Sequence, residues 1–195
     1  MANLITLART ILGFLVVAML HVRTTEVYLA AAGLTITLIA MDALDGYVAR
    51  KRRECSKFGA VFDILGDRVV EMTYWIVFAK FGWVPAWVAI LVSARGIVVD
   101  GFRALAQERG LSAFGATSMM RTRVGAALVS SRASRAIYGV GKALAFSLMI
   151  LFFTPGMLAP VAGALGMLAY ASVYATVALC LVRGLPVLVE GRRLI

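Results

Sequence analysis

The segment DALDGYVARKRRECSKFGAVFDILGD, residues 42–67, carries four aspartates at the facing ends of two apolar stretches. Asp42 and Asp45 are three residues apart, and Asp63 and Asp67 are four apart. Residues at these spacings share one face of a helix, so the pattern predicts two helices that each carry an aspartate pair. The basic residues between the stretches predict a short turn. The helices would then run antiparallel and hold both pairs at a similar depth.

The composition favours a membrane environment for the whole chain. Hydrophobic residues make up 62% of the 195 residues, and the mean hydropathy is +0.90. A soluble domain is usually about 45–50% apolar. The excess is typical of helices whose outer faces contact lipid. We therefore predict an all-α integral membrane bundle that forms a single domain over residues 1–195.

Six hydrophobic stretches have roughly the ~20 residues that a helix needs to cross a bilayer. They lie at about 4–21, 27–49, 58–80, 84–106, 136–154 and 158–182. Basic residues are concentrated after the second, fourth and sixth stretches, and loops rich in Lys and Arg face the cytoplasm. We predict a multi-pass protein of the cytoplasmic (inner) membrane, with both termini and the aspartates on the cytosolic side.

The formal net charge is +10, from 20 Lys and Arg against 10 Asp and Glu. In a soluble protein this excess would suggest nucleic acid. Beside apolar spans, the basic loops are instead expected to lie against anionic lipid headgroups, so the predicted partners are membrane lipids and not nucleic acid. The long basic connection at 107–135 is either an amphipathic helix on the membrane or a plain loop, and the sequence leaves both readings open.

Carboxylates inside apolar helices are costly, and their presence indicates a functional site. Four of them at one depth would repel one another strongly without a counter-charge. Oxygen ligands of this kind suit Mg²⁺ or Mn²⁺ rather than zinc. Small residues beside the aspartates allow close approach of a neighbouring helix or of a ligand, and we interpret Gly66 as a packing residue.

Eight positions of this segment resemble the signature of the CDP-alcohol phosphotransferase family. That signature reads D-x-x-D-G-x-x-A-R, eight residues, G, three residues, D, three residues, D. The matching positions are Asp42, Asp45, Gly46, Ala49, Arg50, Gly59, Asp63 and Asp67. The resemblance implies a six-helix membrane bundle, usually a homodimer, with two divalent metal ions in each active site facing the cytosol.

The resemblance also implies a reaction and roles for these residues. A phosphatidyl group would move from CDP-diacylglycerol, or from CDP-archaeol, to the hydroxyl of a small alcohol, with release of CMP. Asp42, Asp45 and Asp63 would hold the metals, while Asp67 would complete the metal site and accept a proton from the acceptor hydroxyl. The positions expected to bind the CDP-lipid are Gly46, Ala49, Arg50, Ser56 and Gly59.

Two further segments resemble the phosphatidylglycerophosphate synthase branch of this family. They are NLITLART at 3–10 and ARGIVVDGFRALAQERG at 94–110. The likeness implies glycerol 3-phosphate as the acceptor, although Gly96 and Leu144 stand where that branch has a glutamate and a lysine. Inositol phosphate would need a similar basic pocket and serine would not, so both stay open as acceptors. The residues expected to bind the acceptor are Arg103, Arg121, Arg123 and Lys142.

The other charges inside apolar stretches are interpreted first as structural. Glu71 and Arg95 are expected to form an interhelical ion pair, which would compensate both charges. Asp100 and Arg103 lie one turn apart near the expected level of the aspartates. A transporter with an acidic site at membrane depth is the competing class. The gathering of the aspartates at one end of their helices favours the enzyme.

Overall fold

The computed structural model describes the backbone of residues 2–52, 57–111, 119–156 and 159–194. Side chains are described for these residues except 2–3, 42–52, 57–58, 60, 132, 159–161 and 194. The described chain is helical and contains no strand, which confirms the predicted all-α class. Its elements are α1 (Ala2–Met19), α2 (Thr25–Arg52), α3 (Lys57–Lys80), α4 (Ala86–Glu108), α5 (Arg123–Gly125), the π-helical turn η1 (Ala126–Ser130), α6 (Arg132–Phe152), α7 (Ala159–Gly191) and the 3₁₀ turn η2 (Arg192–Leu194).

Local residue chemistry explains several helix boundaries. Pro85 precedes α4 in an extended conformation, which its fixed φ permits and which stops the chain from entering the helix earlier. After α4, Gly110 adopts a φ of 75°, a left-handed conformation that glycine takes at low cost. Ser131 caps α6, because its side chain accepts a hydrogen bond from the Ser134 amide at 3.1 Å.

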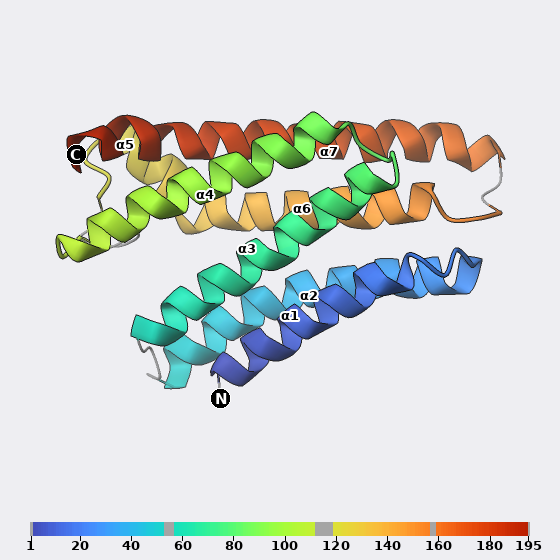
Figure 1. The fold of residues 1–195 in the computed structure, drawn as a ribbon, viewed down its shortest axis with the longest axis horizontal. Helices are drawn as coiled ribbons and strands as arrows, with labels where there is room; N and C mark the ends of the chain where they lie inside the picture. Colours follow the sequence, from blue (N-terminus) through green and yellow to red (C-terminus); the bar gives the residue numbers. More distant parts are fainter. Residues whose placement is uncertain (1, 53–56, 112–118, 157–158, 195) are drawn as a thin grey trace.

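The long helices form an antiparallel bundle (Figure 1). α1 packs on α2 and α3, α6 packs on α2 and α7, and α4 packs on α3 and α7. The turns after α1, α3 and α6 lie at one end of the bundle, whereas both termini, the end of α2 and the start of α3 lie at the other (Figure 1). We call this second end the aspartate end, because it carries residues 42–67.

Two hydrophobic clusters stabilise the bundle. The larger one runs through its middle and includes Trp75 and Phe78 of α3 and Met149 of α6. Within it, the rings of Tyr74 and Phe146 are stacked, with centroids 4.7 Å apart. The smaller cluster lies near the aspartate end and joins α4, α7 and the connection between α4 and α6. Its buried members are Val99, Ala106, Met119, Met120, Val129 and Val187.

Gly66 allows α1 and α3 to approach closely at the aspartate end. A Cβ atom at this position would lie 2.9 Å from Thr6 Cγ2 and 3.0 Å from Thr10 Oγ1. These distances are shorter than normal van der Waals contacts, so a larger residue would have to displace the two threonine side chains or the helix that carries them. The interpretation of Gly66 as a packing residue is therefore confirmed.

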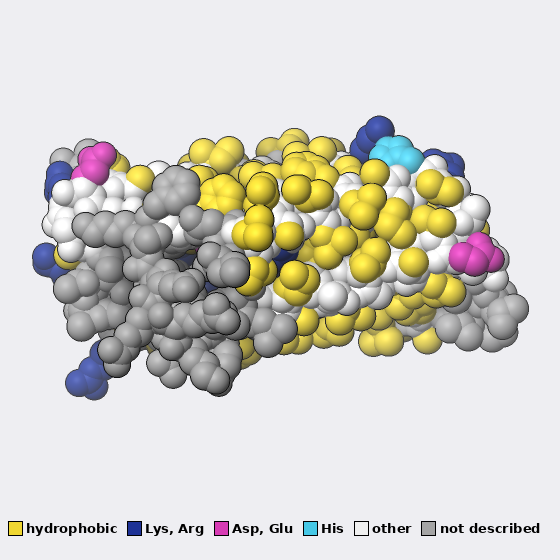
Figure 2. Space-filling model, turned by 90° about the horizontal axis from the view of Figure 1, so that it is seen from below, with side chains coloured by type: hydrophobic (Ala, Val, Ile, Leu, Met, Phe, Trp, Pro, Cys, Tyr) yellow, Lys and Arg dark blue, Asp and Glu magenta, His cyan; other side chains and the backbone are white. Residues whose placement is uncertain are grey.

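The outer surface of the bundle is largely apolar. Exposed large hydrophobic side chains occur on every long helix, for example Ile36, Ile90 and Leu168. On the face seen in Figure 2, hydrophobic side chains cover the middle, and most visible charges lie toward the two ends. Two helical segments, Ala133–Phe152 and Ala162–Gly191, are long and apolar enough to cross a membrane. Each of the six predicted stretches forms a helix, while six spans and cytoplasmic termini stay predictions.

Candidate active site

The two aspartate pairs lie at the same end of the bundle. Residues 42 and 45 belong to the last turns of α2, and Asp63 and Asp67 to the first turns of α3. Among the described residues, no group of three acidic, histidine or cysteine side chains is close enough to hold a metal. This observation leaves the predicted four-aspartate site untested, because several of its members fall outside the described side chains. Those members are Asp42, Asp45, Ala49, Arg50 and Ser56, and Gly46 is described only by its helical backbone.

Asp63 is paired with a buried arginine from the first helix. The Nη2 atom of Arg9 donates a hydrogen bond to Asp63 Oδ1 at 3.1 Å. Arg9 exposes only 1% of its side chain, whereas Asp63 exposes 48%. The guanidinium therefore supports the carboxylate from inside the bundle and leaves its outer side open. Sequence reasoning did not assign Arg9 to the site, although a single charge in the apolar first helix was a signal for it.

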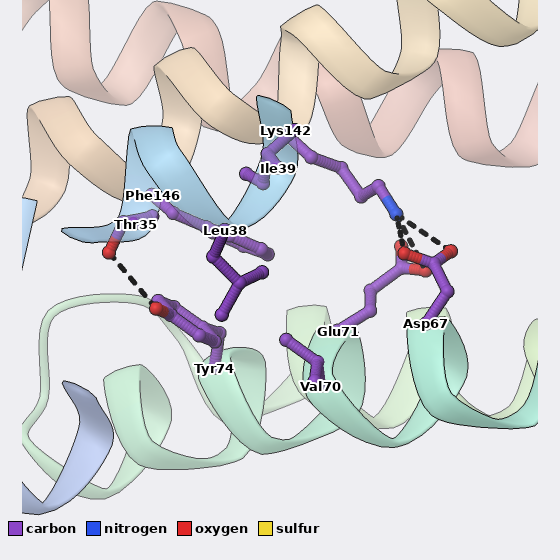
Figure 3. Close-up of a pocket in the computed structure, with 9 residues that line it drawn as sticks. All are labelled: Thr35, Leu38, Ile39, Asp67, Val70, Glu71, Tyr74, Lys142 and Phe146. Carbon is purple, nitrogen blue, oxygen red and sulfur yellow. Dashed lines mark hydrogen bonds and ion pairs between the residues drawn. The ribbon is translucent and has the colours of Figure 1, made fainter. Parts of the chain in front are cut away.

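Asp67 is paired with Lys142 of α6. Lys142 Nζ lies 3.0 Å from each of the two Asp67 carboxylate oxygens and 3.7 Å from Glu71 Oε2. Figure 3 shows the lysine reaching from α6 to both acids of α3. The side chain of Lys142 is buried, and that of Asp67 remains 40% exposed. The residue predicted to act as the base and one residue predicted to bind the acceptor are thus in direct contact.

Behind Asp67, the buried Glu71 contacts two further groups besides Lys142. Its carboxylate accepts a hydrogen bond from Arg68 Nη1 at 3.0 Å, and the Tyr138 hydroxyl donates to its other oxygen. Glu71 exposes only 1% of its side chain. The expected Glu71–Arg95 ion pair is therefore wrong. Arg68 lies one turn away on the same helix and neutralises Glu71 together with Lys142.

Asp100 of α4 joins this network from the neighbouring helix. Arg68 Nε lies 2.9 Å from Asp100 Oδ2, and Arg103 Nη1 lies 3.2 Å from Asp100 Oδ1. The predicted proximity of Asp100 and Arg103 is confirmed. A continuous set of ionic contacts consequently runs from Lys142 through Glu71 and Arg68 to Arg103.

A small cavity lies beneath the carboxylates, between α2, α3 and α6. Its volume is about 10 Å³, and Asp67, Glu71 and Lys142 lie at one end (Figure 3). At the other end, the hydroxyl groups of Thr35 and Tyr74 are hydrogen-bonded at 2.9 Å. A space of this size holds about one water molecule, and it is too small for a substrate. A substrate must therefore reach Asp67 from its exposed side.

Three arginines gather between α4 and α7, next to this network. Arg103 is close enough to Arg95 and Arg183 for their charges to repel. Arg95 packs so tightly on α7 that a Cβ atom at Gly184 would lie 2.7 Å from Arg95 Nε. We call these residues the arginine cluster. Sequence reasoning treated Arg183 only as an orientation signal, because its partners lie on other helices.

The arginine cluster is linked to α6 through Arg183. Its guanidinium donates a hydrogen bond to the Ser134 carbonyl oxygen and lies 5.1 Å from the centre of the Tyr138 ring. Lys142 Nζ lies 5.3 Å from the same ring centre. Arg121 and Arg123, the other predicted acceptor residues, are exposed, and no described contact joins them to Asp67 or Lys142. The structure therefore links Lys142 to Arg103 through Glu71, Arg68 and Asp100, and it shows no such link to Arg121 or Arg123 among the described residues.

Comparison with known proteins identifies relatives of this chain. The residue pattern of the family described as CDP-alcohol phosphatidyltransferase matches residues 1–182. The chain is 40% identical over 78 residues to a CDP-diacylglycerol–glycerol-3-phosphate 3-phosphatidyltransferase of Mycoplasma pneumoniae, with 40% of this chain and 34% of that protein covered. It is 36% identical over 76 residues to the protein of the same name from Bacillus subtilis, with 39% of each covered.

A third relative carries a different name. The chain is 37% identical over 76 residues to a putative cardiolipin synthase of Mycobacterium tuberculosis, with 39% of this chain and 36% of that protein covered. The matched segments thus span little more than a third of the length of these three relatives, whereas the family pattern spans nearly the whole chain. The chain belongs to the CDP-alcohol phosphatidyltransferase family.

Proposed function

We propose that this protein transfers a phosphatidyl group from CDP-diacylglycerol to glycerol 3-phosphate and releases CMP. The observation that carries the proposal is the paired arrangement at Asp67. A half-exposed carboxylate of the family signature is held at both oxygens by a buried lysine, beside a cluster of arginines. The names of the two phosphatidyltransferase relatives support the same donor and acceptor.

We propose that two divalent cations, Mg²⁺ or Mn²⁺, bind Asp42, Asp45, Asp63 and Asp67. The donor set fits such ions, because carboxylate oxygens are the ligands that Mg²⁺ and Mn²⁺ prefer. Each of the two described aspartates, Asp63 and Asp67, forms an ion pair with one basic side chain and keeps a large exposed fraction. The outer side of each carboxylate is therefore accessible to a metal ion. When bound to these aspartates, such ions would neutralise the diphosphate and stabilise CMP as the leaving group.

Asp67 is proposed as the general base. One of its oxygens accepts the proton of the acceptor hydroxyl while the hydroxyl oxygen attacks the phosphorus that carries the lipid. The new oxygen–phosphorus bond forms as the bond to CMP breaks. Lys142 contacts both oxygens of Asp67 and so fixes the direction of the carboxylate. A base within hydrogen-bond reach of the hydroxyl typically contributes about 10²–10⁴-fold to the rate.

The CDP-lipid is proposed to bind along the last turns of α2 and the first turns of α3. The family signature supports Gly46, Ala49, Arg50, Ser56 and Gly59 in this role. Gly59 lies one turn before Asp63 on α3, which is consistent with a diphosphate held next to the metals. The apolar outer face of the same helices would contact the lipid tails, for example through Val61 and Leu65, both exposed.

The acceptor phosphate is proposed to bind Lys142, Arg103 and the rest of the arginine cluster. Arg103 already contacts Asp100, whereas for Arg95 the described residues offer no acidic contact. Arg95, Arg103 and Arg183 carry three positive charges, and the only carboxylate described in contact with them is that of Asp100. Guanidinium groups bind phosphate oxygens strongly, so the cluster suits a phosphate dianion. Arg121 and Arg123 lie farther out and are proposed to attract the anionic substrate to the site by long-range electrostatics.

Cardiolipin synthesis is a second candidate function, because a relative of similar identity carries that name. Its acceptor would be phosphatidylglycerol, which also presents a phosphate and a free hydroxyl. Gly96 stands where the phosphatidylglycerophosphate synthase branch has a glutamate, and this departure is the reason for testing a second acceptor. A Cβ atom there would lie 3.1 Å from Arg68 Cδ, so Arg68 occupies space that a larger residue at position 96 would take. A glutamate side chain at position 96 would need the space that Arg68 fills in this chain.

The purified protein in detergent provides the test. It would receive CDP-diacylglycerol, Mg²⁺ or Mn²⁺, and in separate reactions glycerol 3-phosphate, inositol phosphate, serine or phosphatidylglycerol. CMP is measured by chromatography and the lipid product by mass spectrometry. We expect turnover with glycerol 3-phosphate. Turnover with another acceptor alone would replace it, and no turnover together with ion flux in liposomes would favour a transporter.

The proposed setting of this reaction is the cytosolic face of the cytoplasmic membrane. The apolar outer surface and the two long apolar helices support membrane insertion. The basic residues near the aspartate end support a cytosolic position for that end. A homodimer is proposed from the family resemblance, and the exposed apolar faces of the bundle leave room for a second copy beside lipid.

A further inference from the structure

Glu190, near the end of α7, binds the connection that leads into α6. Its Oε2 atom accepts hydrogen bonds from the backbone amides of Arg121 at 2.5 Å and Thr122 at 3.4 Å. Its Oε1 atom accepts a hydrogen bond from the Thr122 hydroxyl at 2.5 Å. The glutamate exposes only 8% of its surface. One buried carboxylate thus binds three donors from a segment almost seventy residues earlier in the chain.

The bound segment, residues 121–125, is shaped to fit this carboxylate, and we call it the clamp segment. Thr122 accepts a hydrogen bond from the Gly125 amide at 3.0 Å, so the segment folds into a tight turn around the glutamate. A Cβ atom at Gly125 would lie 2.4 Å from Glu190 Oε1 and 2.8 Å from Thr122 Oγ1. No side chain fits at position 125 while Glu190 stays in place, so these two residues are complementary in shape.

The clamp segment leads through η1 into α6, the helix that carries Tyr138 and Lys142. η1 follows it at once, and Ser134 in the first turn of α6 donates its hydroxyl to the Leu128 carbonyl oxygen. The backbone carbonyl oxygen of the same serine accepts the hydrogen bond from Arg183. Farther along α6 lie Tyr138 and Lys142, which contact Glu71 and Asp67. The start of α6 is therefore connected at one end to Glu190 and at the other to the arginine cluster.

The smaller hydrophobic cluster supports the same arrangement. Met120, next to the clamp segment, and Val129 of η1 are buried against Val187 of α7 and Val99 of α4. This apolar contact does not by itself fix the orientation of the connection on α7, because hydrophobic burial is non-directional. The three hydrogen bonds to Glu190 are directional and can fix the register of the connection on α7.

We propose that Glu190 is a positioning residue for the acceptor site, one that acts by holding the clamp segment and through it Arg183 and the start of α6. This inference rests on the proposed function, because the acceptor phosphate is assigned to the arginine cluster. Glu190 touches neither the aspartates nor Lys142 among the described contacts. Its loss should therefore change how the acceptor binds and leave the binding of the CDP-lipid unchanged.

Steady-state kinetics of Glu190→Ala test this role. The substrates are CDP-diacylglycerol and the acceptor, among glycerol 3-phosphate, inositol phosphate, serine and phosphatidylglycerol, that the unsubstituted protein uses. We expect the KM for a phosphorylated acceptor to rise about tenfold, the size expected for lost hydrogen bonds to a charged group. The KM for CDP-diacylglycerol should stay within about twofold, and kcat should fall less than the acceptor KM rises. Glu26→Ala, an exposed glutamate in the first turn of α2 at the opposite end, is the matched control.

Gly125→Ala provides a second test, because it disturbs the same contact from the side of the clamp segment. The added Cβ should push the glutamate out of its turn and reproduce the rise in acceptor KM. In a protein that already carries Glu190→Ala, the clash with the glutamate is gone and only the close approach to Thr122 Oγ1 remains, so the same Gly125→Ala change should have a much smaller further effect. This non-additivity would show that the two residues act as one unit. A merely destabilising effect would lower the amount of active protein, and therefore the apparent kcat, while leaving the acceptor KM unchanged.

Hydrogen exchange of the backbone amides gives a readout without substrate. In Glu190→Ala, the amides of Arg121 and Thr122 should exchange faster than in the unsubstituted protein, while amides in the middle of α3 should not. If an active Glu190→Ala protein has the same acceptor KM as the unsubstituted protein, the positioning role is overturned and the proposed function stays intact. Absence of turnover by the unsubstituted protein with every acceptor would overturn the proposed function instead, and the two failures are thus distinguishable.

Discussion

Lys142 Nζ lies 3.0 Å from both carboxylate oxygens of Asp67, and the two residues come from helices that are far apart in the sequence. This contact places a buried positive charge against the last aspartate of the family signature. The same lysine lies 3.7 Å from Glu71, so it is shared between the proposed base and a buried structural acid.

Replacing the proposed base should abolish transfer without preventing folding. Asp67→Asn keeps the size of the side chain but cannot accept the acceptor proton, so CMP release should fall by about 100-fold or more. Asp42→Asn should have a comparable effect through loss of a metal ligand. CMP release in detergent, at matched amounts of purified protein, is the measurement. Near-normal release by either variant would contradict the mechanism.

Removing the lysine should impair use of the acceptor. Lys142→Met deletes the only cation in contact with both oxygens of Asp67 among the described residues, and kcat/KM for the acceptor should fall on the order of 100-fold. Lys142→Arg should retain part of the activity, because it keeps the charge. Lys80→Met, an exposed lysine at the opposite end of α3, serves as the control and should behave like the unsubstituted protein.

Enlarging Gly66 should destabilise the contact between the first and third helices. Gly66→Ala places a Cβ atom 2.9 Å from Thr6 Cγ2, and such overpacking costs about 1–3 kcal/mol. Gly33→Ala is the matched control, because nothing lies within 4 Å of a Cβ atom at that position of α2. Thermal unfolding in detergent should show a lower midpoint for the first variant and an equal or higher one for the second. The reverse order would refute the packing role.

Chelation of divalent cations should remove activity and leave the fold in place. With EDTA, CMP release should cease, and added Mg²⁺ or Mn²⁺ should restore it. The helical circular dichroism signal should change little, because buried apolar side chains and the pairs of Arg9 and Lys142 hold the bundle independently of metal. Full activity in excess EDTA would speak against the metal assignment.

The sequence predicted the helices well because hydropathy and length are local properties. The predicted stretch 4–21 corresponds to α1 at Ala2–Met19, and 58–80 corresponds to α3 at Lys57–Lys80. The prediction failed at the end of the chain, where the last stretch was ended at 182 but α7 continues to Gly191. The charge of Arg183 indicated the end of the apolar stretch, but the residues beyond 182 continue the helix, and Arg183, Val187 and Glu190 are buried against α4, α6 and the clamp segment.

The side-chain partners were less predictable, because they depend on which helices pack together. The pair of Arg9 and Asp63 joins residues 54 positions apart, and the sequence offered several equally charged alternatives. The expected partner of Glu71 was Arg95 on another helix, but Arg68 on the same helix takes that place. The connection at 107–135, left open as loop or amphipathic helix, contains in its described part the short α5 and the π-helical η1.

The buried contact between Arg9 and Asp63 also limits how the first helix can be exchanged between related proteins. A helix that serves only as a membrane anchor can be replaced by any apolar sequence of equal length. Here such a replacement would remove the guanidinium beneath one of the four aspartates and leave its carboxylate without that support. Chimeras that graft a foreign first helix onto this bundle should therefore work only when the donor helix brings an arginine at the register of Arg9.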